Sequence, residues 1–216
     1  MKGVKEGFEL LESLGVNREI QQVFAPVLRE DACGRLIAEY RNEKGRVVDQ
    51  EVLAVSMQKL SACGFLHFSP ALPENVRVLY ISDAIMHLIF MAQCKFKRMN
   101  FAYSAFLSIG ARMDRGLILH GITQYPKEVK IYTVFGHSLI GRIKECKVQH
   151  WIKGLECSFR VEGNKVVAFI QGKEFWMSAG EFSLRNHLRQ IGIRQTVSTC
   201  KPFDKNIDNF YLFNYF

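Results

Sequence analysis

Two stretches of the chain share one pattern, and that pattern constrains the fold more than any other feature. Residues 76–93 (VRVLYISDAIMHLIFMAQ) and 129–142 (VKIYTVFGHSLIGR) each begin with a β-branched and aromatic run, pass through a polar break and continue as a helix-like segment. One unit of a parallel α/β sheet has this pattern. Ligands of such sheets gather at the carboxyl ends of the strands, so we expect any site to lie at the two polar breaks.

The pattern continues between these stretches and predicts an alternating α/β region. We expect strands at 76–82, 101–107 and 129–135, and helices at 83–95, 113–124 and 139–153. Three strands with two helix-like connections predict a parallel, right-handed arrangement.

The chain before this region has a different pattern. Val4, Phe8, Leu11 and Leu14 repeat at helical spacing, and Gly15 follows as a helix C-cap would. Two β-rich runs then flank a turn that ends at Gly45, which predicts a hairpin of residues 34–40 and 46–55. We place a boundary near residue 74, so that residues 1–74 form a small N-terminal α+β subdomain and residues 75–216 an α/β domain.

The pattern changes again after the alternating region. Runs at 157–161 and 165–170 flank a Glu-Gly-Asn turn, which predicts an antiparallel hairpin that 174–177 extends, an insertion of about 157–177. A helix at 182–191, stopped by Gly192, and a last strand at 196–199 follow. The tail 201–216 is so rich in aromatics that we expect it to dock on the domain, a protein partner or a second copy of the chain.

Composition narrows the classes of function. Residues 1–75 hold nine Lys/Arg and eleven Asp/Glu, whereas residues 76–216 hold twenty and ten, so the net charge of +8 comes from the second half. Such a basic half favours polyanions such as nucleic acid, or serves solubility alone. Six scattered cysteines form no CxxC pair, and no segment approaches the length of a membrane span or resembles a secretory signal. We therefore expect free thiols and a cytoplasmic protein that does not contact membranes.

The alternating region resembles the Toprim domain of bacterial-type primases, topoisomerases and related nucleases, over roughly residues 75–155. Residues 8–68 are similar to the segment that precedes this domain in primase-like proteins of plasmids and phages. A weaker likeness lies in the tail, where Lys201, Asp204 and Asn206 match a Lys-x-x-Asp-x-Asn ending. The resemblance implies a parallel sheet with flanking helices and a magnesium-dependent phosphoryl-transfer ancestry.

The residues that this family uses to hold magnesium are absent here. The resemblance places Ser82 where the family has a glutamate, and Gly136 and Ser138 where it has an Asp-x-Asp pair. A hydroxyl without anionic neighbours is a poor ligand for Mg²⁺. We therefore expect no catalytic residues, no metal and no cofactor, and a protein that is not an enzyme.

An alternative site could still be built from other residues. Asp83 and His87 share one face of the predicted helix, and His137 follows the neighbouring strand. Together they would form a rearranged His/carboxylate metal site, of the kind a metal-dependent phosphoesterase using Mg²⁺ would need. The competing interpretation is a capping Asp83 and two ordinary histidines.

Positive side chains suggest a nucleic-acid surface. The candidates for phosphate contacts are Lys95, Lys97, Arg98, Arg112, Arg115, Arg142 and Lys144. Residues 136–141 also have the GxxxxG spacing of a phosphate loop, although Arg142 and Ile143 replace its lysine and Ser/Thr. That turn suits backbone anion binding or serves only as a tight strand–helix connection.

The sequence thus predicts a catalytically degenerate Toprim-like accessory protein associated with nucleic acid. The resemblance alone suggests replication or mobilisation of bacterial mobile elements. Two alternatives remain: the metal-dependent phosphoesterase, and a structural interaction protein that uses its aromatic tail.

Overall fold

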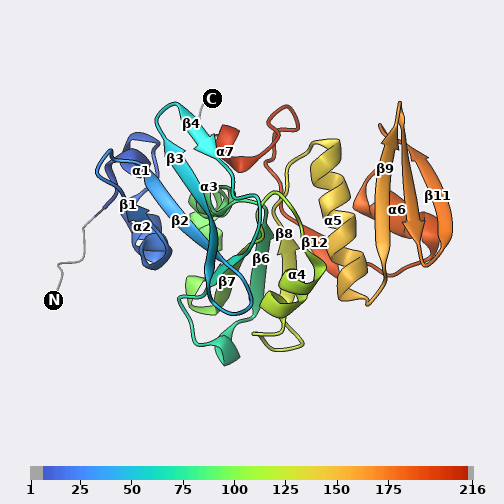
Figure 1. The fold of residues 1–216 in the computed structure, drawn as a ribbon, viewed down its shortest axis with the longest axis horizontal. Coiled ribbons are helices and arrows are strands. Elements are labelled where there is room, and N and C mark those ends of the chain that lie inside the picture. The colour runs from blue at the N-terminus through green and yellow to red at the C-terminus, as the bar shows by residue number, and fades with distance from the viewer. Residues whose placement is uncertain (1–6, 214–216) are drawn as a thin grey trace.

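A mostly parallel sheet of five strands lies at the centre of the chain, in a computed structural model that describes residues 7–213 (Figure 1). The strand order is β12-β8-β6-β7-β5. The bounds are β5 (Leu66–Phe68), β6 (Val78–Ser82), β7 (Ser104–Ser108), β8 (Lys130–Thr133) and β12 (Val197–Thr199). The first four strands in that order run parallel, and β5 is antiparallel to β7. The predicted mixed α/β fold is confirmed.

Helices cover both faces of this sheet. They are α3 (Ile85–Lys95), α4 (Arg115–Ile122) and α5 (Leu139–Ile152). Every residue of β7 is buried, which is the pattern of a strand covered on both faces. Asp114 and Ser138 cap α4 and α5, accepting hydrogen bonds from Leu117 N and Gly141 N at 2.9 and 3.2 Å.

The strand expected at 101–107 begins later, at Ser104, because a 3₁₀ turn replaces its start. The side chain of Asn100 accepts a hydrogen bond from Ala102 N at 3.1 Å and so supports this turn. The 3₁₀ helices are η1 (Ala25–Val27), η2 (Pro73–Asn75), η3 (Phe96–Arg98) and η4 (Phe101–Tyr103).

The N-terminal part forms an antiparallel sheet in the order β1-β2-β3-β4. Its elements are α1 (Glu9–Ser13), α2 (Arg18–Phe24), β1 (Arg29–Glu30), β2 (Leu36–Arg41), β3 (Val47–Ala54) and β4 (Met57–Lys59). The predicted hairpin is confirmed as β2 and β3, and α2 is an addition to the prediction. Val4 of the predicted first helix lies outside the described residues. The ring of Phe24 lies 4.9 Å from that of Phe106, so this part packs on the central sheet.

The C-terminal part adds a second antiparallel sheet, in the order β11-β10-β9 (Figure 1). Its strands are β9 (Cys157–Glu162), β10 (Lys165–Ile170) and β11 (Lys173–Ser178), followed by α6 (Leu184–Ile191). The predicted hairpin and its extension are confirmed. Gly192 ends α6 in the left-handed conformation, with φ of 71°.

Two apolar cores lie on opposite faces of the central sheet, because side chains alternate along β6. Tyr80 packs against the core that contains Phe24 and α3, while Leu79 and Ile81 belong to the core beside α5 and the C-terminal sheet. The tail ends in α7 (Phe210–Phe213), and Phe210 is buried in the first core. The expected docking of the tail on the domain is thus observed, while residues 214–216 lie outside the described part.

The structure also bears on two expectations from the sequence, free thiols and the lack of a membrane span. The six cysteines, all within residues 7–213, are free thiols. No helix in that part of the chain combines the length and apolarity that a membrane crossing requires.

Candidate functional site

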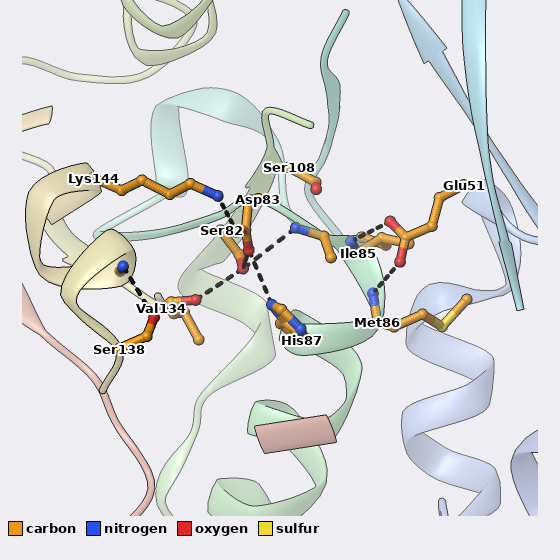
Figure 2. Close-up of polar contacts among 12 residues, drawn as sticks. Glu51, Ser82, Asp83, Ile85, Met86, His87, Ser108, Val134, Ser138 and Lys144 are labelled. Atoms are coloured by element: carbon orange, nitrogen blue, oxygen red, sulfur yellow. Dashed lines mark hydrogen bonds and ion pairs between the residues drawn. The ribbon is translucent and has the colours of Figure 1, made fainter. Parts of the chain in front are cut away.

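Ser82 is the last residue of β6, at the carboxyl edge of the central sheet, and its side chain has a structural role. Its side chain is fully buried, and its hydroxyl donates a hydrogen bond to the carbonyl of Val134 at 2.8 Å (Figure 2). That bond ties the ends of β6 and β8 together. The resemblance placed a metal-binding glutamate at this position, and the hydroxyl found there is already engaged with the backbone.

Asp83 lies beside it and contacts two side chains, the imidazole of His87 and the ammonium group of Lys144 (Figure 2). One carboxylate oxygen contacts His87 Nδ1 at 3.0 Å and the other accepts a hydrogen bond from Lys144 Nζ at 2.5 Å. Burial alone would raise the pKa of Asp83, but the hydrogen bonds and charges of His87 and Lys144 outweigh it and hold that pKa well below its usual range. Lys144, predicted to contact phosphate, is instead an internal ion partner.

Magnesium does not fit this edge of the sheet. Mg²⁺ is bound through carboxylate oxygens whose charge is available to it. The Asp83 carboxylate is instead ion-paired with Lys144, whose side chain is only 14% exposed. Within residues 7–213 no group of three or more His, Cys, Asp or Glu side chains is placed to hold a metal ion.

The structure brings together only part of the alternative metal set. Asp83 and His87 are in contact, as their spacing predicted. His137, however, directs Nε2 to the carbonyl of Pro202 at 3.0 Å. These three residues therefore do not form a ligand set. The competing prediction that Asp83 caps the helix is also wrong, because Ala84 is the N-cap of α3 and provides no side-chain cap.

The N-terminus of α3 is capped instead by a carboxylate from the N-terminal sheet. Glu51 on β3 accepts hydrogen bonds from the backbone N–H groups of Ile85 and Met86 at 2.8 and 3.3 Å (Figure 2). The hydroxyl of Tyr40 donates to the same carboxylate at 2.7 Å. Burial nevertheless raises the pKa of Glu51. Sequence reasoning missed Glu51, although it lies two residues before inward-facing Leu53 and so had to face the interior.

The N-terminus of α5 is likewise occupied by a carboxylate of the chain. Asp208 in the tail accepts a hydrogen bond from Ser138 N at 2.5 Å, and its own carbonyl accepts one from His137 N at 2.8 Å. A Cβ on Gly136 would lie 2.5 Å from the Asp208 carboxylate, and one on Gly141 would lie 2.5 Å from the Gly136 carbonyl. The glycine spacing therefore creates a tight turn into which the tail fits.

The predicted phosphate contacts divide into two groups. Arg115 is paired with Glu156 at 2.7 Å, and Arg142 donates to the Phe182 carbonyl at 2.6 Å. Arg112 is exposed, and its backbone N–H donates to Ala62. The other group, Lys95, Lys97 and Arg98, lies together at the end of α3 and in η3.

These three residues line a hollow of about 550 Å³ between the end of α3 and the start of the tail, which we call the basic hollow. Lys201 adds a fourth cation to the lining, and it is paired with Glu145 at 2.9 Å. The lining contains no carboxylate and includes the aromatic rings of Phe96, Phe203 and Phe210. The basic hollow therefore combines positive charge with aromatic surface.

Comparisons with known proteins add little to this geometry. No family model and no curated protein matches the chain. Among solved structures, the DnaG primase catalytic domain bound to single-stranded DNA is similar at a TM-score of 0.38 and 12% identity, covering 65% of this chain and 60% of that one. The E. coli primase catalytic core is similar at 0.33 and 13%, covering 67% and 52%.

The chain thus spans less than two thirds of the length of either primase structure. Similarity at this level does not identify the family of the chain.

Proposed function

We propose that this protein binds nucleic acid without catalysing a reaction on it, and that the basic hollow is where it does so. The observation that carries the proposal is the lining of the basic hollow, four cations and three aromatic rings without a carboxylate. Cations bind the phosphates of a nucleic acid, and aromatic rings stack on its unpaired bases.

The cations of the basic hollow are available to a ligand to different extents. Lys97 and Arg98 are exposed, and neither forms an ion pair within the described part of the chain. Lys95 lies 6.0 Å above the ring of Phe210, and Lys201 is paired with Glu145. We therefore assign the main phosphate contacts to Lys97 and Arg98.

The aromatic contribution favours single-stranded over double-stranded nucleic acid. Phe203 is 87% exposed, the most exposed of the large apolar side chains in the described residues. Bases within a duplex are stacked on one another, whereas unpaired bases can stack on a protein ring, at about 1–3 kcal/mol per base. We assign Phe203 this stacking role.

The state of the sheet edge supports the non-catalytic part of the proposal. Asp83 is neutralised by Lys144, and the N-termini of α3 and α5 are occupied by Glu51 and Asp208. Phosphoryl transfer needs charge aimed at the reacting phosphate, and these groups compensate one another instead. The sequence resemblance to primase-like proteins of plasmids and phages supports an accessory role in replication or mobilisation of such elements.

A salt series with labelled oligonucleotides tests the proposal. Fluorescence anisotropy of the full chain with a single-stranded DNA of about 20 nucleotides should show binding that weakens with salt. The double variant Lys97→Glu/Arg98→Glu should lower the affinity by about tenfold or more and reduce the salt slope by about 1.4, since each phosphate contact contributes about 0.7 on a single strand. Phe203→Ala should weaken single-strand binding and leave the salt slope unchanged.

The matched control carries the same charge change at residues away from the basic hollow. Lys44→Glu/Arg46→Glu lies in the β2–β3 turn, on exposed residues that do not line the basic hollow. If this control weakens binding as much as Lys97→Glu/Arg98→Glu does, the effect is one of net charge and the assignment to the basic hollow is wrong. Absence of binding at low salt would refute the function itself.

A further inference from the structure

A second hollow, of about 560 Å³, lies where α5, α6 and the C-terminal sheet end together. Five apolar side chains form its lining. They are Leu155, Ile170, Phe175, Ile191 and Ile193. Four of the five are aliphatic, and none belongs to the basic hollow. We call this site the aliphatic hollow, and its volume is in the range of small-molecule sites.

The other residues of the lining make the aliphatic hollow positively charged. Lys153, Lys173 and Arg194 line it with Gln171, and no carboxylate does. All three cations are exposed, and none takes part in an ion pair between residues 7 and 213. Apolar surface and unpaired positive charge therefore occur side by side.

The neighbouring helix ends do not cancel this charge. Lys153 is the C-cap of α5, and Ile191 is the last residue of α6. A helix C-terminus carries roughly half a negative charge, so two such ends offset about one of the three positive charges. The aliphatic hollow remains net positive.

We propose that the aliphatic hollow binds an organic anion that has an aliphatic chain and a single acidic head, either a carboxylate or a phosphate monoester. The chain would lie against Ile170, Ile191 and Ile193, and the head would contact Lys153, Lys173 or Arg194. A bare inorganic anion would leave the apolar lining in water, and an amphipathic cation would meet three like charges. Nucleotides fit less well, since Phe175 is the one aromatic ring in the lining.

Isothermal titration of the full chain with a matched set of probes tests this proposal. Decanoate and decyl phosphate, each below its micelle concentration, should bind at one site. Decyltrimethylammonium should bind at least about tenfold more weakly, which corresponds to ~1.4 kcal/mol. Inorganic phosphate should not bind measurably at the same concentrations. Comparison of the two anionic probes shows whether the natural head is a carboxylate or a phosphate.

Variants locate the binding on the aliphatic hollow. Lys153→Glu/Arg194→Glu should weaken decanoate binding by about tenfold or more, while the control Lys44→Glu/Arg46→Glu, with the same charge change, should not. Lys173→Gln changes an exposed residue at the start of β11 and provides a milder variant, with an expected weakening of a few-fold, in case the charge reversal impairs folding. Ile193→Ser should weaken decanoate but leave the preference over decyltrimethylammonium intact.

Three results with the amphipathic probes would overturn the proposal. They are equal binding of decanoate and decyltrimethylammonium, decanoate binding that is unchanged in both charge variants, and no binding of any amphipathic probe. A further result would also overturn it. If single-stranded DNA displaces decanoate equally well from the wild-type protein and from the Lys97→Glu/Arg98→Glu variant, the aliphatic hollow is a nucleic-acid site. None of these results depends on whether the basic hollow binds DNA.

Discussion

Acid should destabilise this protein through a pair of buried histidines. His150 on α5 and His187 on α6 approach with their Nε2 atoms 2.9 Å apart, and both residues are almost fully buried. One ring must donate in this contact and the other accept. Protonation of the accepting ring would place two N–H groups face to face, in surroundings that include the rings of Phe159 and Phe182.

The magnitude follows from the pKa values. Burial lowers the pKa of His150 and of His187 from 6.5 to about 4, and the neighbouring His150 adds to the effect on His187. Between these values the unfolded chain binds protons that the folded chain does not. The stabilisation is therefore fully present above the unfolded pKa and is lost as the pH falls toward 4. From pH 7 to pH 5 the loss is about 2 kcal/mol per histidine, or about 4 kcal/mol for both.

Urea unfolding at pH 7 and pH 5 measures this loss. The double variant His150→Leu/His187→Leu removes both titrations, so its free energy of unfolding should fall by about 4 kcal/mol less than that of wild type over this interval. Every other titrating group is common to both proteins and cancels in the comparison. If the double variant loses as much stability as wild type, the buried pair is not the source of the acid sensitivity.

Three further predictions concern the edge of the central sheet, each measured by urea unfolding at pH 7. Lys144→Met should destabilise by about 3–5 kcal/mol because it leaves Asp83 buried without its main cation, and adding Asp83→Asn should restore part of the loss. Glu51→Gln should cost about 1.5–3 kcal/mol by weakening the charged hydrogen bonds at the start of α3. Gly136→Ala should cost about 1–3 kcal/mol by crowding Asp208. Asp208→Ala should cost about 1 kcal/mol by removing the carboxylate that accepts the Ser138 N–H beside the start of α5. Gly136→Ala and Asp208→Ala both act on the contact of the tail with the turn before α5. The double variant should therefore lose less free energy of unfolding than the sum of the two single losses.

The alternating part of the fold could be predicted because each element carries its own local signal. Residues 76–82 and 129–135 each carry a β-branched and aromatic run that indicates a strand, and β6 and β8 are found there. The turn that ends at Gly45 predicted its hairpin by the same local chemistry. Helix α2 was missed, because Pro26 follows it closely and disfavours a helix, and because its capping residue, Asn17, was overlooked.

The site was predicted less well, because its partners come from distant parts of the chain. The contact of Asp83 with His87 follows from helical spacing and was predicted. The contacts of Glu51 with Ile85 and of Asp208 with Ser138 join residues far apart in sequence, and no local sequence pattern predicts them. Sequence spacing alone therefore identified the edge of the sheet and left open how the chain occupies it.

The position of β12 has a consequence for how the chain folds during synthesis. This strand pairs with β8, yet the whole C-terminal sheet and α6 lie between the two in sequence. The outer edge of β8 therefore stays uncovered on the ribosome until residues 197–199 emerge, and an open parallel edge invites wrong pairing with other chains. Binding of the nascent protein by a chaperone at that stage would protect the edge, and a chain halted before residue 197 should aggregate more readily than one halted after residue 210.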